Sequence, residues 1–215
     1  MTERLVSLMI GYFLGIIQTS YLIGKTKGID IRKHGSGNAG TTNAIRIMGK
    51  KIGVITFLCD CFKCIIAVIL VHFLFKESFP TYIRLLRLYA ATGAILGHNF
   101  PFYLKFKGGK GIACTAGLLA SYYLPLGLAA LFVFVLIFGI TNYVSLGSLA
   151  INIVFLVGTI IMGVTGVMDM PSNYVMEMYM LAAFICVMAF WRHRANIGRL
   201  LAGTENKTYL GKRKK

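Results

Sequence analysis

Residues 112–168 read IACTAGLLASYYLPLGLAALFVFVLIFGITNYVSLGSLAINIVFLVGTIIMGVTGVM and contain no Lys, Arg, Asp or Glu. A helix needs ~20 apolar residues to cross the hydrocarbon layer of a bilayer, so this stretch is too long for a single crossing. Pro125 and the pair Thr141-Asn142 are the positions that favour a break. We expect helices near 112–124, 126–140 and 144–167, the first of them short for a complete crossing.

Apolar runs also lie on both sides of this stretch. The run at 5–24 has no charge and no small-residue cleavage site after it, so it predicts a retained helix and not a removed leader. The run at 52–75 is interrupted by one Asp, one Lys and one His, and it predicts a second helix. Further apolar runs predict helices at 84–104 and 176–191.

The composition agrees with a membrane protein. The 215 residues are 57% hydrophobic and only 14% charged, whereas a soluble domain usually has about a quarter charged residues. With 15 Phe and 11 Tyr, the chain is also too rich in aromatic residues for a disordered protein. Four of its five Cys lie in apolar runs, so we interpret them as small hydrophobic residues and not as a disulfide framework.

The basic residues are concentrated in three segments and predict the topology. Segments 25–51, 105–110 and 192–215 contain 18 of the 23 Lys and Arg residues. Because basic residues near the ends of membrane helices stay in the cytoplasm, all three segments are expected there. This requires three crossings within 112–168. The prediction is an all-α, seven-helix protein with its amino terminus outside and its carboxyl terminus in the cytoplasm.

We expect one transmembrane domain over 1–215, with motif segments at 25–51, 105–111 and 192–205 and a basic tail at 206–215. The alternative is a five-helix protein, in which part of 112–168 is re-entrant or forms one long tilted helix.

The first motif segment contains GSGNAGTTNAIR, residues 35–46. Alternating glycines let successive backbone N–H groups turn toward one point, and hydroxyl and amide side chains add further donors. An Arg adds a two-pronged contact to a phosphate. The alternative is a solvated connecting loop. The candidate catalytic and phosphate-binding residues in this segment are Ser36, Gly37, Asn38, Gly40, Thr42, Asn43 and Arg46.

The second motif segment reads GHNFPFYLKFKGGKG, residues 97–111. It has no Walker pattern, but a glycine pair beside lysines at the start of an apolar helix favours an anion site. Membrane topology alone also accounts for the lysines. His98 is either a general base or only a hydrogen-bonded residue. The candidates here are His98, Lys107, Gly108, Gly109 and Lys110.

The third motif segment reads RHRANIGRLLAGTE, residues 192–205. His193 and Asn196 are three positions apart and share a face if the segment is helical. Glu205 is the single acid among the basic residues and is expected to orient one of them. Outside the motifs, Asp60 and Lys63 are three apart in the second helix, and we interpret them as a structural ion pair.

In their order, spacing and location at helix ends, the three segments resemble the motifs of the bacterial membrane acyl-phosphate:glycerol-3-phosphate acyltransferase family. The resemblance covers essentially the whole chain and implies acyl transfer from acyl phosphate to the sn-1 hydroxyl of glycerol 3-phosphate. The implied products are lysophosphatidic acid and phosphate, formed at the cytoplasmic face of the bacterial inner membrane. The expected partners are these two substrates and the bilayer, without a cofactor, metal, nucleic acid or obligate protein partner.

The donor is already a mixed anhydride, so no acyl-enzyme is needed, and positioning and charge stabilisation can supply most of the acceleration. The His-x4-Asp signature of soluble-type glycerolipid acyltransferases is absent. Two alternatives stay open at this point. One is a transporter or flippase for a phosphorylated solute or lipid, and the other is a basic lipid-binding scaffold.

Overall fold

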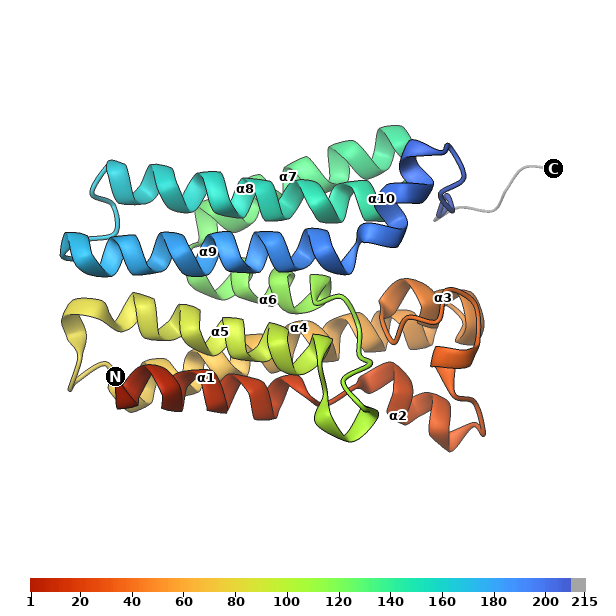
Figure 1. The fold of residues 1–215 in the computed structure, drawn as a ribbon, viewed down its shortest axis with the longest axis horizontal. Helices are drawn as coiled ribbons and strands as arrows, with labels where there is room; N and C mark the ends of the chain where they lie inside the picture. Colours follow the sequence, from red (N-terminus) through yellow and green to blue (C-terminus); the bar gives the residue numbers. More distant parts are fainter. Residues whose placement is uncertain (210–215) are drawn as a thin grey trace.

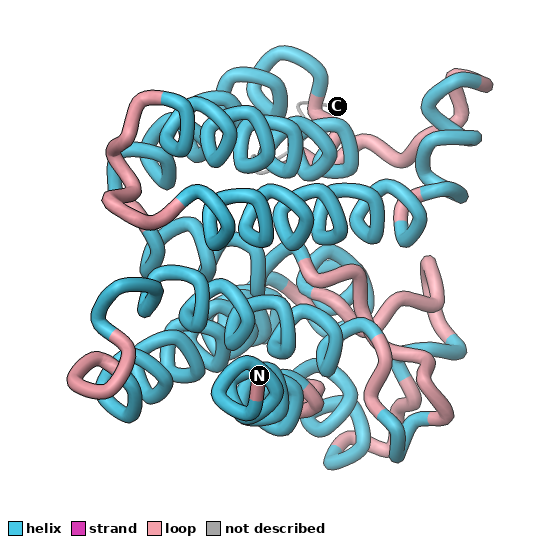
Figure 2. The backbone as a smooth tube through the Cα atoms, turned by 60° about the vertical axis from the view of Figure 1, so that its left-hand side comes forward, coloured by secondary structure: helices cyan, strands magenta, loops and turns pink. Residues whose placement is uncertain are grey.

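The computed structural model describes residues 1–209, and every regular element in that range is a helix (Figure 2). The long helices run side by side along the longest axis of the molecule (Figure 1). In chain order the elements are α1 (Thr2–Gly15), α2 (Thr19–Thr26), η1 (Ile31–Lys33), α3 (Thr41–Met48), α4 (Lys50–Phe75), η2 (Pro80–Tyr82), α5 (Ile83–Asn99), η3 (Phe102–Leu104), α6 (Ile112–Tyr122), α7 (Leu124–Thr141), α8 (Val144–Val164), α9 (Ser172–Arg192) and α10 (Arg194–Leu201).

All seven apolar runs that the sequence singled out contain helix. Five segments are long and apolar enough to cross a membrane: Thr2–Thr26, Lys50–Phe75, Leu124–Thr141, Val144–Val164 and Ser172–Arg192. The other two helices are shorter, since α5 has 17 residues and α6 has 11. The short length of α6 agrees with the expectation for 112–124. The break predicted at Thr141-Asn142 is also present, since Asn142 ends α7 with a left-handed φ of 59°. Seven crossings stay a prediction.

Two predicted helices differ from the observed ones: one is broken near its centre, and the other ends earlier than expected. The expected single helix at 5–24 is divided between α1 and α2, because the carbonyls of Ile16 and Ile17 turn away to accept hydrogen bonds from Tyr103 (2.9 Å) and Lys63 (2.7 Å). The helix expected to reach 104 ends at Asn99. Pro101 disfavours helical geometry in the residue before it and cannot donate a backbone hydrogen bond.

Helices α1 and α5 approach each other closely through glycine. A Cβ placed on Gly11 would lie 1.9 Å from the Ala90 carbonyl oxygen, and one on Gly93 would lie 2.0 Å from the Leu8 carbonyl oxygen. Gly15 and Gly97 repeat this four residues further along each helix. Small residues at four-residue spacing are typical of close helix packing in membranes, where apolar surface alone gives little attraction between helices.

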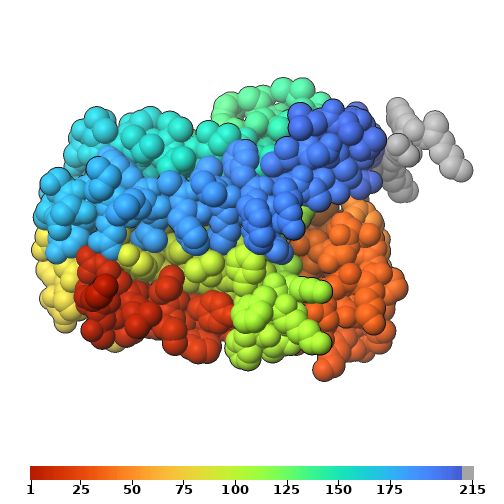
Figure 3. Space-filling model, in the orientation of Figure 1, coloured from red at the N-terminus to blue at the C-terminus, as the bar shows by residue number. Residues whose placement is uncertain are grey.

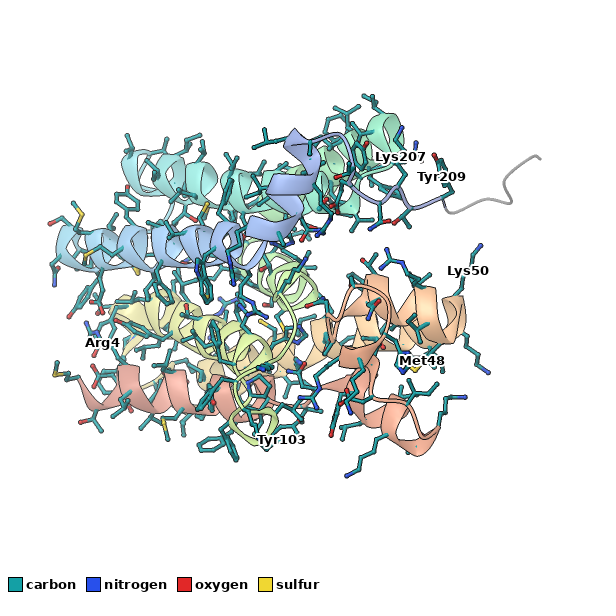
Figure 4. All side chains as sticks on the ribbon, turned by 45° about the vertical axis from the view of Figure 1, so that its right-hand side comes forward. Arg4, Met48, Lys50, Tyr103, Lys207 and Tyr209 are labelled. Atoms are coloured by element: carbon teal, nitrogen blue, oxygen red, sulfur yellow. The ribbon has the colours of Figure 1, made fainter. Side chains whose placement is uncertain are left out.

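An ion-pair network joins α1, α5 and α9 at the end of the bundle where the chain begins. Arg4 binds Glu177 through Nε (2.6 Å) and Nη2 (2.9 Å), and Tyr89 donates to the same carboxylate at 2.6 Å. Figure 4 shows Arg4 toward this end of the molecule, whereas Lys50 and Lys207 lie toward the other. The network closes one end of the bundle, while the opposite end carries the motif segments.

Candidate active site

The three motif segments gather at one end of the bundle. The first loop with α3, the loop before α6, and α10 all lie in the right-hand half of the molecule in Figure 1 and in the space-filling view of Figure 3. Arg32 of the first segment reaches the second, with Nη1 3.4 Å from the Leu104 carbonyl oxygen. Lys110 of the second reaches the third through Asn196. We call this end of the bundle the motif end.

Asn43 organises the first loop. Its Oδ1 accepts from the Ser36 backbone N–H at 3.0 Å, and its Nδ2 donates to the carbonyls of Ile31 (3.2 Å) and His34 (2.9 Å). The side chain is almost fully buried. Asn43 therefore fixes the turn around Ser36. Both ends of its side-chain amide are already hydrogen-bonded within the loop, which leaves neither end free for the predicted contact with a phosphate.

Other residues of the first loop are open to a ligand. Ser36 and Arg46 are exposed, and within residues 1–209 neither the Ser36 hydroxyl nor the Arg46 guanidinium has a hydrogen-bond partner. Gly37 has a φ of 70°, which favours glycine. Asn38 and Thr42 are partly buried near the start of α3, and Gly40 is its N-cap.

His98 is part of a buried cluster with two residues of α4. Its Nδ1 lies 2.9 Å from the Lys63 ammonium and 3.6 Å from Asp60 Oδ1, and Lys63 also donates to Asp60 at 2.7 Å. All three side chains are at most 5% exposed. The predicted Asp60–Lys63 ion pair is confirmed, but its contact with His98 was missed because the residues lie on different helices.

Gly108 and Gly109 let the second loop pass directly over His98. Their N–H groups donate to the carbonyls of Asn99 (3.2 Å) and His98 (3.0 Å). These two N–H groups are therefore used within the protein, and they do not point toward an anion as predicted. A Cβ on Gly109 would lie 2.0 Å from His98 Nε2, so glycine is required here for space.

Arg192 holds the same glycine pair from the other side. Its guanidinium donates to the Gly109 carbonyl from Nε (3.1 Å) and to the Gly108 carbonyl from Nη2 (3.0 Å). The ring of Phe100 lies 5.3 Å from its central carbon. Arg192 thus joins α9 to the second loop. Its place in the third motif is the only feature of the sequence that points to this role.

The two candidate lysines of the second loop differ in their surroundings. Lys107 is exposed, and its ammonium has no hydrogen-bond or ion-pair partner among the described residues. Lys110 is partly buried and donates to Asn196 Oδ1. Burial and the nearby charges of Arg199 and Arg192 lower the pKa of Lys110 to about 8.

The third segment is not one continuous helix. His193 separates α9 from α10 and is the N-cap of α10, so His193 and Asn196 do not both lie within one helix. Both residues are nevertheless buried at the motif end. His193 Nδ1 lies 2.8 Å from the Ala189 carbonyl oxygen, and burial together with the charge of Lys110 lowers the pKa of His193 to about 4.

Glu205 lies at the centre of a polar network, as its predicted orienting role requires. Asn196 Nδ2 and Arg199 Nε each donate to it at 2.7 Å, and the Ser145 hydroxyl of α8 donates at 3.1 Å. Burial raises the pKa of Glu205, but these three hydrogen bonds outweigh that effect and lower it overall. Ser145 and Arg199 were not among the predicted residues.

Part of the basic tail lies against the turn between α7 and α8. The Thr208 N–H donates to the Asn142 carbonyl at 2.9 Å, and the Lys207 ammonium lies 5.5 Å from the Tyr143 ring centre. The last basic residues, 212–215, lie outside the described range. Among the described residues, no three or more His, Cys, Asp or Glu side chains form a group that could hold a metal ion.

The sequence is similar to that of known acyltransferases. A family model described as glycerol-3-phosphate acyltransferase matches residues 5–203. The chain is 39% identical over 211 residues to the glycerol-3-phosphate acyltransferase of Shouchella clausii (strain KSM-K16), covering 97% of both chains. It is 41% identical over 208 residues to glycerol-3-phosphate acyltransferase 2 of Thermotoga maritima (strain ATCC 43589 / DSM 3109 / JCM 10099 / NBRC 100826 / MSB8), covering 95% of this chain and 96% of that relative.

The fold is similar to two crystal structures of PlsY (YgiH), an integral membrane glycerol 3-phosphate acyltransferase. The glycerol 3-phosphate form matches with a TM-score of 0.81 and 33% identity, covering 96% of both chains. The lysophosphatidic acid form matches with a TM-score of 0.78 and 32% identity, covering 96% of this chain and 95% of that one. The present chain is likewise an all-α, multi-pass integral membrane protein.

Proposed function

The chain belongs to the glycerol-3-phosphate acyltransferase family, and from that premise we propose that acyl phosphate is its acyl donor. As a glycerol-3-phosphate acyltransferase, it makes lysophosphatidic acid. In the proposed reaction the acyl group is transferred to the sn-1 hydroxyl of glycerol 3-phosphate, and inorganic phosphate is released. This is the first step of bacterial phospholipid biosynthesis.

The observation that carries this proposal is the partly buried Lys110 in contact with Asn196, beside Arg192 and Arg199, at a helix-bundle end. Burial is the main cause of the lowered pKa of Lys110, and the charges of Arg199 and Arg192 lower it further; a bound phosphate would offset both effects. Exposed Arg46 and Lys107 add further cations at the same end. Two phosphate-bearing substrates, one with a long acyl chain, match basic loops placed directly beside apolar helices.

The chemistry needs no covalent enzyme intermediate. The glycerol 3-phosphate hydroxyl oxygen forms a bond to the acyl carbon while the bond from that carbon to the phosphate oxygen breaks. The departing phosphate takes up the hydroxyl proton, since His98 Nδ1 already accepts a hydrogen bond from the Lys63 ammonium. Donors aimed at the developing oxyanion supply the rate enhancement.

Each motif segment has its own proposed role in binding the two substrates. Ser36 and Arg46 bind the phosphate or reacting carbonyl of the donor, supported by Asn38, Thr42 and the loop that Asn43 holds. Lys107 and Lys110 neutralise phosphate charge. His193 and Asn196 hold glycerol 3-phosphate, and Glu205 orients Asn196.

The proposed membrane arrangement has seven crossings, with the amino terminus outside and the motif end at the cytoplasmic face of the bacterial inner membrane. The concentration of basic residues in the motif segments supports it. The test is labelling of single cysteines, introduced near Gly37 and near Gly109 on a Cys-free background. Both positions should label from the cytoplasmic side, and labelling from opposite sides would contradict the arrangement.

The donor is tested with purified protein in detergent, glycerol 3-phosphate and either palmitoyl phosphate or palmitoyl-CoA. We expect lysophosphatidic acid and phosphate release with palmitoyl phosphate alone. Comparable turnover with palmitoyl-CoA under matched conditions would rule out acyl phosphate as the dedicated donor. The transporter and scaffold alternatives predict no phosphate release at all.

A further inference from the structure

We propose that Arg84, Arg87 and His72 form a binding site for the phosphate of an anionic phospholipid, in the half of the bundle opposite the motif end. The site is separate from the acyltransferase machinery and goes beyond the proposed function. We call these three residues the distal basic site.

Arg87 is the central residue of the distal basic site. Its Nη2 donates to the carbonyl of Ser121 in the last turn of α6, where helix carbonyls have no partner within the helix. Its Nε atom is buried and has no hydrogen-bond partner. The guanidinium has five N–H donors, so capping α6 leaves most of its hydrogen-bonding capacity unused.

The residues around Arg87 add positive charge without a matching acid. Arg84 precedes Arg87 by three residues in α5, so both arginines lie on the same face of that helix, and His72 lies near the end of α4, which packs against α5. The Nδ1 atom of His72 is also buried without a partner. Among residues 1–209, no Asp or Glu forms an ion pair with either arginine.

The acids nearest to this site are already paired. Glu177 and Glu3 are both bound by Arg4, and Glu77 lies 3.5 Å from Lys76. The distal basic site therefore has no acid of its own chain to neutralise it. Arginine within a membrane protein is costly unless it is paired, so an anion from outside the chain is the expected partner. A phosphate suits the planar fork of arginine.

The position of the site indicates that a lipid supplies this phosphate. Helix α6 spans only ~16 Å, so it meets α7 part-way along the bundle, short of the end that α5, α8 and α9 reach (Figure 1). Arg87 stands about 6 Å along α5 from its start, at the level of this junction.

Apolar side chains border the same region. Phe73 and Leu74 of α4, and Leu124 and Leu128 of α7, are each more than half exposed in the isolated chain. In a membrane these side chains contact acyl chains. A lipid whose acyl chains lie on these side chains holds its phosphate beside the arginines, whereas a free anion gains nothing from the apolar surface.

A site-specific fluorescence measurement tests the proposal. The only tryptophan, Trp191, is replaced in Trp191→Phe, and Tyr123→Trp places a single tryptophan at the α6–α7 junction. The protein is reconstituted into vesicles of brominated phosphatidylglycerol mixed with phosphatidylcholine, and quenching gives the relative binding constants of the two lipids. We expect about fivefold or greater preference for phosphatidylglycerol.

Arg84→Gln is the decisive variant, because Arg84 caps no helix, and it should remove most of this preference while leaving acyltransferase activity unchanged. Arg87→Gln should do the same if α6 stays folded. The control is Lys51→Gln at the motif end, which should keep the preference. Equal quenching by both lipids, preference that survives Arg84→Gln, or loss of preference on adding millimolar inorganic phosphate would each overturn the assignment.

Discussion

Gly109→Ala is expected to inactivate the enzyme by displacing His98. The added Cβ would lie 2.0 Å from His98 Nε2, whereas ordinary contacts begin at 3.4 Å, so the ring must retreat by about 1.4 Å. Lys63 Nζ lies 2.9 Å from Nδ1 on the other side of the ring, and the side chain is only 2% exposed. The ring therefore has no open space to move into.

A displacement of about 1 Å in an active site lowers the rate by ~100-fold, which corresponds to ~2.7 kcal/mol of transition-state stabilisation. We expect kcat for lysophosphatidic acid formation to fall by about this factor. Gly139→Ala is the matched control, since a Cβ there has no neighbour within 4 Å, and it should retain activity. Thermal unfolding of both variants in detergent checks that the bundle is intact.

A double-mutant cycle isolates the cause. In a His98→Ala background the clash no longer exists, so adding Gly109→Ala should change activity by less than about twofold. Near-normal activity of Gly109→Ala alone would refute the inference that the position of His98 matters for catalysis. An equal loss in both backgrounds would show that Gly109 acts on the loop and not through His98.

Four further outcomes are expected at the motif end. Arg46→Lys should lower kcat/KM at least about tenfold, because an ammonium lacks the two-pronged fork, and near-normal kcat/KM would exclude a clamp. Ser36→Ala should cost ~2.7–4 kcal/mol of activation free energy if its hydroxyl contacts the oxyanion, so initial rates at saturating substrate test that contact. Asn43→Ala should destabilise the protein by about 1–3 kcal/mol per buried partner left unpaired, measured by denaturant unfolding. Since the Lys110 pKa is lowered to about 8, this group is charged below that pH, and kcat/KM, which reports the free enzyme, should fall as pH rises through 8. Lys110→Arg should remove this fall, because a guanidinium stays charged.

The sequence alone determined the class of protein and the location of its helices. An apolar run of this length crosses a bilayer as a helix, since a helix pairs every backbone polar group inside the segment, and each of the seven runs contains helix. Two interruptions were also visible, because Pro125 and Asn142 have local backbone preferences that act without tertiary context. The three motifs pointed to the family because each is a short continuous pattern that can be recognised without the tertiary structure.

Only the tertiary structure decided which side chains meet. His98 contacts Lys63 from a distance of 35 residues along the chain, and Lys110 contacts Asn196 from a distance of 86. The break between α1 and α2 likewise depends on hydrogen bonds from Lys63 and Tyr103, which lie far from the break along the chain. Such contacts depend on how each helix is rotated about its axis and on where it ends. Those quantities follow from close packing, such as the glycine contact between α1 and α5, and helical periodicity within one segment carries no information about them.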